Sequence, residues 1–353
     1  MSQGPSDDRQ DDDAPDESAP PAKVRPLLHA VLFLATFLTT TSTGALHAHG
    51  FARIAPISDG LSYSLPLMLI LLCHELGHYI VARRHGVAAS LPYFIPLPPG
   101  LGLGTMGAVI GMRSATTDRK QLIDVGAAGP LAGLVVAIPL MIYGLLHSDV
   151  GPRIAAVPDG MAATMEGNSI LYGILKVIVK GAWLPNSQSD VFLHPTAYAA
   201  WAGLLVTMIN LLPIGQLDGG HIASAYFGNR YNRFAEHLRR LLPIMAIVVF
   251  FWVLYVLKAE AGRAWNLETA AEIALGAALF WVVWYFLVSL MRRLTGGMNH
   301  PRVDDQPLPR SRRALFWLMV VVFVAVFMPV PFRQIMSGST GAAASRISAG
   351  PGS

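Results

Sequence analysis

The sequence predicts an all-α polytopic membrane protein with about seven transmembrane helices and one small re-entrant β-hairpin or loop. Of the 353 residues, 53% are hydrophobic and only 14% are charged, and the mean hydropathy is +0.47. Charge-free apolar windows recur along the chain, and a helix that crosses a bilayer needs about 20 such residues. This composition excludes an ordinary soluble globular domain.

The two ends of the chain differ from the part between them. Residues 1–24 are rich in Asp, Pro, Ser and Ala, so we expect a disordered acidic tail, and an acidic start is unlike a secretory signal peptide. We expect residues 25–335 to form one integral membrane domain and residues 336–353 to form a flexible tail. The only cysteine, Cys73, excludes an internal disulfide framework.

Seven windows are long and apolar enough to predict membrane-spanning helices. An eighth window, Ser169–Leu184, is interrupted by Lys176 and Lys180 and has apolar residues at helical spacing, which favours an amphipathic helix at the membrane surface over a further span. The seven windows are Pro26–Gly50, Leu61–Ala82, Val125–Ser148, Val191–Leu217, Leu241–Leu257, Ile273–Met291 and Ala314–Phe332.

The positive charges predict the orientation of these spans. If the N-terminus lies inside, 18 of the 26 Lys and Arg residues fall in inner segments, as the positive-inside rule requires. We therefore expect a cytoplasmic N-terminus and read the basic excess as membrane orientation. We do not expect nucleic-acid binding.

The segment Leu91–Gly111 cannot be a regular membrane helix, because it is apolar but full of proline and glycine. Non-helical backbone at membrane depth survives only where protein or a water-filled cavity surrounds it. The strand-like content of Thr105–Met112 therefore predicts a re-entrant loop or hairpin that lines a cavity.

The sequence His74-Glu75-Leu76-Gly77-His78 near the inner end of the second window is an H-E-x-x-H motif. Two histidines four residues apart share one helix face and can bind one metal ion, with the glutamate as general base. A carboxylate inside an apolar span is costly unless it has a partner or a function. The alternative is a pair of polar histidines that pack between helices, with Glu75 bonded to one of them.

A catalytic zinc site needs three protein ligands and one open position. Asp218 ends the charge-free window of the fourth span at its inner end, on the membrane side where His74 and His78 lie. We expect its side chain to point into the helix bundle where that helix ends. His221 is a weaker candidate for the third ligand.

Three motifs together resemble the site-2 proteases, which are intramembrane zinc metalloproteases. They are the H-E-L-G-H sequence, the small-residue run 126–133, and the sequence N-L-L-P-I-G-Q-L-D-G-G-H at 210–221. The runs 194–220 and 92–114 are especially similar to the short bacterial relatives of the plastid members. The resemblance covers about residues 60–225, and no segment between spans is long enough for the PDZ or CBS modules that many relatives carry.

The resemblance implies one Zn²⁺ per chain held by His74, His78 and Asp218, with Glu75 as the catalytic acid/base. It also implies that Asn210 lies near the substrate or an oxyanion. On physical grounds, an extended substrate could pair with a strand edge at Gly104–Met112, close to the zinc, so Thr105 and Gly107 are the candidate substrate-binding residues on that edge.

We therefore expect an intramembrane zinc metalloendopeptidase that cleaves membrane-spanning proteins in or near their transmembrane segments. Its expected location is a bacterial inner membrane, with the active site toward the cytoplasm. The alternatives are a transporter or channel that uses the His/Glu/Asp cluster as a metal or proton relay, and a silent protein that only binds transmembrane partners.

Overall fold

A computed structural model describes residues 25–49, 57–111, 118–152, 162–186, 188–259, 267–294 and 303–336. The tail expected over residues 1–24, and all of the C-terminal tail except residue 336, lie outside them. Within the described ranges the chain is mostly helical. The elements are α1 (Pro26–His49), α2 (Ile57–Arg84), β1 (Tyr93–Pro96), β2 (Thr105–Val109), α3 (Arg119–Leu146), β3 (Asp149–Pro152), β4 (Ala162–Glu166), α4 (Ile170–Lys180), β5 (Ser189–Phe192), α5 (Pro195–Asn210), α6 (Asp218–Phe227), a 3₁₀ turn (Gly228–Arg230), α7 (Tyr231–Ala259), α8 (Leu267–Leu294), α9 (Arg310–Val326) and β6 (Phe332–Met336).

Five helical stretches in the described ranges are long and apolar enough to cross a membrane, so the chain is an integral membrane protein. They are Pro26–His47, Ile57–Arg84, Arg119–Leu146, Asp218–Ala259 and Leu267–Arg293. The other two expected windows also contain helices, but α5 has 16 residues and α9 has 17. By length and composition, five of the seven expected spans therefore qualify as membrane-spanning helices.

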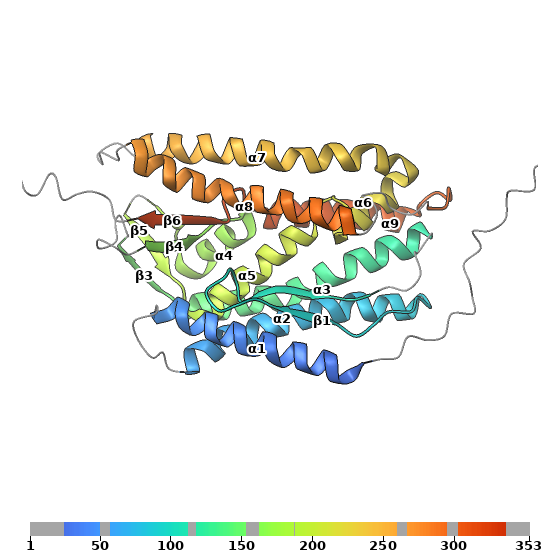
Figure 1. Cartoon of the computed structure of the whole chain (residues 1–353), viewed down its shortest axis with the longest axis horizontal. Helices are drawn as coiled ribbons and strands as arrows, with labels where there is room; N and C mark the ends of the chain where they lie inside the picture. Colours follow the sequence, from blue (N-terminus) through green and yellow to red (C-terminus); the bar gives the residue numbers. More distant parts are fainter. Residues whose placement is uncertain are drawn as a thin grey trace, which may run out of the picture.

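The helices run side by side along the long axis of the molecule (Figure 1). The helices α7 and α8 form a pair on one side, α1 lies on the other, and α2, α3 and α5 lie between them. The helix α5 is buried on nearly all sides, with Trp201 fully enclosed. A short apolar helix is stable in this place because its neighbours, α2 and α3, surround it with side chains rather than lipid.

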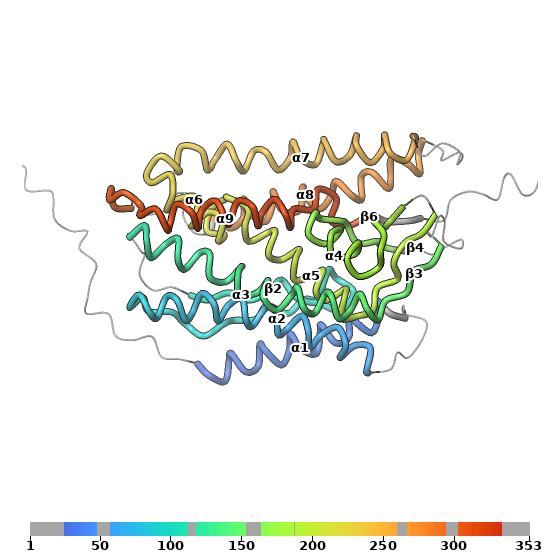
Figure 2. Tube along the Cα trace, turned by 180° about the vertical axis from the view of Figure 1, so that it is seen from behind, coloured from blue at the N-terminus to red at the C-terminus, as the bar shows by residue number. Residues whose placement is uncertain are grey.

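Four strands gather beside α4 at one end of the bundle, whereas α6 and the start of α9 lie at the other end (Figure 2). The strands form two antiparallel pairs, β3 with β5 and β4 with β6. No sequence pattern predicted these pairs. Their partners are distant in sequence, with Ala162 opposite Met336, so no local turn signal announces them.

The expected segment contains a hairpin, formed by β1 and β2 in antiparallel register with an irregularity between Phe94 and Pro96. Two side chains of the bundle anchor its turn: the Tyr63 hydroxyl donates to the Leu103 oxygen (3.0 Å) and the Thr39 hydroxyl donates to the Gly104 oxygen (2.8 Å). Gly104 has φ +77°, and a Cβ there would lie 2.5 Å from the Thr43 hydroxyl, so only glycine fits this turn. Met112, the last residue of the expected strand edge, lies outside the described residues.

The expected helix in Ser169–Leu184 is α4, which has 11 residues. At 1.5 Å per residue it is far shorter than the roughly 30 Å of a bilayer core. Its exposed residues Ile170, Ile174 and Ile178 lie on one face. This arrangement agrees with an amphipathic helix and not with an eighth span.

Candidate metal centre

The two histidines of the H-E-x-x-H motif lie in the last three turns of α2, on the face that packs against α3. His74 is 3% exposed and His78 is 6% exposed. The imidazole Nδ1 of His78 donates to the backbone oxygen of Val125 on α3 (2.7 Å). That bond puts the proton on Nδ1 and leaves the Nε2 lone pair free to bind a metal.

Asp218 begins the short helix α6 rather than ending the fourth span, which corrects the sequence interpretation. The helix α5 ends at Asn210, and the chain turns back through Gly215, whose φ is +57°. A Cβ at Gly219 would overlap the Leu211 oxygen, and a Cβ at Gly220 would overlap the Gly215 oxygen. The two glycines after Asp218 therefore allow the tight turn that brings its carboxylate into the bundle.

Two imidazole nitrogens and both carboxylate oxygens of Asp218 converge at this point. The Nε2 atoms of His74 and His78 are 3.2 Å apart, and each lies 3.2 Å from a carboxylate oxygen of Asp218. In a tetrahedral zinc site with bonds of about 2.0–2.1 Å, neighbouring ligand atoms are about 3.3–3.4 Å apart. Within the described ranges, the buried oxygen Oδ2 of Asp218 accepts no hydrogen bond and has only the His74 imidazole nearby as a possible charge partner, so a cation would satisfy an otherwise costly group. The donor set fits one Zn²⁺.

Small residues on α3 make room for these imidazoles. A Cβ on Gly129 would overlap the His78 ring, and a Cβ on Gly133 would lie 3.4 Å from His74. Gly77 on α2 is similarly tight, because a Cβ there would lie 2.6 Å from the Ala128 oxygen. The glycines thus let α2 and α3 approach closely enough for the backbone of α3 to contact a ligand on α2.

Glu75 is buried, with 5% of its surface exposed. Among the described residues, no hydrogen bond or ion pair engages its carboxylate. The packing alternative predicted a bond from Glu75 to one of the histidines, and none is found in that part of the chain. A carboxylate without a structural partner, one residue from His74, is suited to proton transfer.

Asn210 lies at the edge of the ligand group. Its side-chain nitrogen lies 3.2 Å from Nε2 of His74. An amide donor therefore lies next to the converging ligand atoms. His221, the weaker sequence candidate for the third ligand, does not belong to the converging group in the described ranges.

The structure does not bring Thr105 and Gly107 into contact with the three converging residues. Thr105 holds the hairpin together, because its hydroxyl donates to the Ile95 oxygen (2.9 Å) and accepts from the Gly107 N–H (2.9 Å). Gly107 has φ +98° and open space where a Cβ would be. The strand β2 packs against α2, the helix that carries the histidines.

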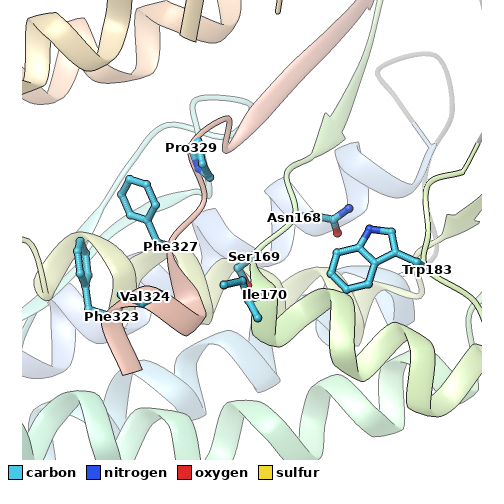
Figure 3. A pocket seen from close by; sticks show the side chains of 8 residues that line it. All are labelled: Asn168, Ser169, Ile170, Trp183, Phe323, Val324, Phe327 and Pro329. Atoms are coloured by element: carbon cyan, nitrogen blue, oxygen red, sulfur yellow. The ribbon is translucent and has the colours of Figure 1, made fainter. Parts of the chain in front are cut away.

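A cavity of about 370 Å³ lies far from this centre, between the start of α4 and the end of α9 (Figure 3). Its lining is mostly apolar, with Ile170, Trp183 and Phe327 among its residues, and includes no acidic residue, histidine or cysteine. The residues that line this cavity therefore offer no carboxylate or imidazole for acid/base chemistry.

Three features of the centre were not found by sequence reasoning. They are the backbone oxygen of Val125, the space left by Gly129, and Arg119, which hydrogen bonds to the end of α6. The small-residue run 126–133 was the only local signal for the first two. The Arg119 contact joins positions more than 100 residues apart, and no spacing rule predicts such a contact.

Comparisons with known proteins agree with this geometry. The chain is 33% identical over 220 residues to the probable zinc metalloprotease EGY2, chloroplastic, of Arabidopsis thaliana, covering 60% of this chain and 37% of that protein. It is 33% identical over 225 residues to the probable zinc metalloprotease EGY1, chloroplastic, of the same plant, covering 62% and 40%. A rice protein, probable zinc metalloprotease EGY3, chloroplastic, is 24% identical over 321 residues, covering 84% and 47%.

The chain thus spans less than half the length of these relatives. No solved structure matches it significantly. The family model of peptidase family M50 matches residues 62–255, which include His74, His78 and Asp218. This match confirms the family resemblance that the motifs indicate. Because the matched segment is more than half of the chain, the protein belongs to peptidase family M50.

Proposed function

We propose that this chain is an intramembrane zinc metalloendopeptidase, with the metal held by His74, His78 and Asp218. The observation that supports this proposal best is the convergence of His74, His78 and Asp218 in a buried site between apolar helices, where each pair of side chains is in contact at 3.2 Å. The names of the EGY relatives, probable zinc metalloproteases, support the same chemistry.

Glu75 is the proposed acid/base. A Zn²⁺ ion held by His74, His78 and Asp218 would act as a Lewis acid, which lowers the pKa of water and polarises a carbonyl group. Glu75 takes the proton of the attacking water and later delivers it to the leaving amine, which requires a carboxylate that no structural partner holds. The amide of Asn210 is placed to donate a hydrogen bond to the oxygen of the substrate carbonyl.

The proposed substrates are membrane-spanning proteins, cut in or near their transmembrane segments. A peptide bond within a regular helix is shielded by its own turns, so the substrate must unwind. The edge of β2 that does not face β1 is the proposed docking site, because an extended substrate could satisfy its free backbone groups. Thr105 and Gly107 contribute by shaping this strand.

We also propose seven membrane crossings, with α5 and α9 added to the five long stretches, and the N-terminus in the cytoplasm. Lys and Arg residues support this orientation, because the end of α2 carries Arg83 and Arg84 and the end of α8 carries Arg292 and Arg293. The metal centre then lies toward the cytoplasmic side of a bacterial inner membrane. Residues 25–335 form the protease domain between two tails.

A Glu75→Gln variant tests the proposal. Glutamine keeps the shape of the side chain but cannot accept the water proton, and acid/base catalysis contributes about 10²–10⁴-fold. We expect the purified variant to keep one zinc and to lose cleavage by at least 100-fold, and single-span proteins to accumulate in cells that express it. The control is Glu272→Gln, which changes an exposed glutamate of α8.

The same experiment separates the alternatives. A relay protein or a silent binding protein has no cleavage to lose, so wild-type and variant membranes would contain the same set of proteins. Wild-type-like turnover by the Glu75→Gln variant would remove Glu75 from the mechanism.

A further inference from the structure

Arg119, the first residue of α3, holds the far end of the helix that carries Asp218. Its Nε donates to the Ala225 oxygen (2.7 Å) and its Nη2 donates to the Tyr226 oxygen (2.7 Å), both in the last turn of α6. Its Nη1 donates to the Gln306 oxygen (3.0 Å), in the segment that leads into α9. One guanidinium thus joins three parts of the chain.

The end of α6 is a natural place for a cation. The last carbonyls of a helix have no partner within the helix, and the helix dipole makes this end negative. A planar guanidinium can donate to several carbonyls in fixed directions, which a lysine cannot. Arg119 therefore fixes the direction of α6 as well as stabilising its end.

The direction of α6 decides where the Asp218 carboxylate lies. The helix has 10 residues, so it is about 15 Å long, with Arg119 at one end and Asp218 at the other. A tilt of a few degrees at the clamped end would displace the carboxylate by about an ångström. At the Asp218 end, α6 packs closely against α3, because a Cβ on Gly126 would lie 3.3 Å from the backbone oxygen of Asp218.

The segment before α9 takes part in the same arrangement. Asn229 and Val303 exchange two hydrogen bonds, at 3.2 and 3.3 Å, between an amide side chain and a backbone. Val303 and Leu308 also pack in a buried apolar cluster with Ile222 of α6. Residues 303–319 lie beyond the segment 62–255 that the family model matches, yet they brace the helix that carries a ligand.

We propose that Arg119 is a positioning residue for Asp218, acting through α6 and braced by residues 303–308. This inference rests on the proposed function, because it takes Asp218 as a zinc ligand. The competing explanation is that Arg119 is a cationic anchor at the membrane surface with no effect on the metal centre.

The experiment measures the metal and not the peptidase activity. The full chain is purified in detergent, its zinc dissociation constant is measured by competition with a chelating indicator, and the visible absorption of the Co²⁺-substituted protein reports the ligand geometry. We expect Arg119→Gln to weaken zinc binding by about 10–100-fold, as loss of a residue that orients a ligand does elsewhere, and to change the Co²⁺ spectrum. Arg119→Lys keeps the charge and should fall between Arg119→Gln and the wild type.

The matched control is Arg239→Gln, which removes an arginine whose hydrogen bonds go to Glu236 and Ser289 on α7 and α8. It should bind zinc like the wild type. A folded Arg119→Gln protein with wild-type affinity and spectrum would overturn the positioning role. If Arg119→Gln does not fold, Arg119→Lys decides, and a wild-type affinity and spectrum there would overturn the proposal.

The two proposals fail in different ways. If the wild-type chain binds no zinc, or His74→Ala binds it as tightly as the wild type, the proposed metal centre itself is wrong. If the wild type and His74→Ala behave as expected but Arg119→Gln matches the wild type, only the role of Arg119 is wrong.

Discussion

The side chain of His78 and the backbone of Val125 are joined by a hydrogen bond of 2.7 Å between α2 and α3. This bond fixes the tautomer and the ring plane of His78, and it directs Nε2 toward Asp218 on a third helix, 3.2 Å away. The centre is therefore assembled by the packing of α2, α3 and α6, and changes in that packing should be measurable as changes in metal binding.

Removing one ligand should weaken zinc binding steeply, because the two that remain cannot close a tetrahedral site. We expect one zinc per chain in the purified wild type, and we expect His74→Ala and Asp218→Ala each to lose most of it. Zinc can be counted by elemental analysis of the folded variants. Full retention of zinc in both variants would rule out this ligand set.

Gly129→Ala should disturb the centre without changing a ligand. The added methyl group would overlap the imidazole of His78, so the ring must leave its position or the two helices must separate. We expect zinc affinity to fall at least tenfold. The matched control is Gly133→Ala, whose methyl group would lie 3.4 Å from His74 and should be tolerated. Equal affinities in the two variants would contradict this account of the packing.

Proline substitutions on β2 test the docking edge. The N–H of Gly111 donates to the Ser90 hydroxyl (2.8 Å) and its backbone oxygen accepts from the Ser90 N–H (2.9 Å). Because the direction of the backbone groups alternates along a strand, the N–H and oxygen of Ala108 and Ile110 point away from β1. A proline cannot donate a ladder hydrogen bond. In a proline scan of Gly107–Gly111, we expect Ala108→Pro and Ile110→Pro to impair cleavage of a transmembrane substrate while zinc content and expression stay normal.

The alternative is a hairpin that only packs the helices. In that case every proline variant that folds and binds zinc would cleave normally, and the substrate would be held elsewhere.

We expect the stability of the strand-rich end to depend on pH because it contains the buried carboxyl group of Glu166. Burial raises the pKa of Glu166 from 4.5 to about 7, although Lys176 and the Tyr172 hydroxyl partly oppose the shift. The folded state then holds this proton more tightly than the unfolded state. The resulting stabilisation is complete below about pH 4.5 and is lost as the pH rises through about 7.

Glu166→Gln should remove this contribution, so the midpoint of thermal unfolding should change less between pH 4.5 and 7 than it does in the wild type. The measurement is thermal unfolding in detergent at several pH values, with Glu272→Gln as the control. An unchanged pH profile in Glu166→Gln would show that another group is responsible.

Local patterns in the sequence were sufficient to predict the long apolar helices, the H-E-x-x-H motif and the re-entrant hairpin at Leu91–Gly111. Helix periodicity places His74 and His78 on one face, and the excess of proline and glycine excludes a helix over the hairpin; both effects act between near neighbours. The position of Asp218 at the inner end of an apolar window made it the candidate third ligand, and the family resemblance supported this choice and added Asn210. The sequence placed Asp218 at the end of a helix, however, and the structure places it at the start of α6.

Only the tertiary structure decided how the ligands meet. The distance from Asp218 to the histidines depends on the turn through Gly215, on the absence of a side chain at Gly129 and on the hydrogen bonds of Arg119 to the end of α6. These features bring α2, α3 and α6 into contact. The pairing of β4 with β6 likewise joins segments about 170 residues apart. Such contacts form because burial and hydrogen bonding are satisfied across the whole bundle, and no pattern within a short window of sequence records them.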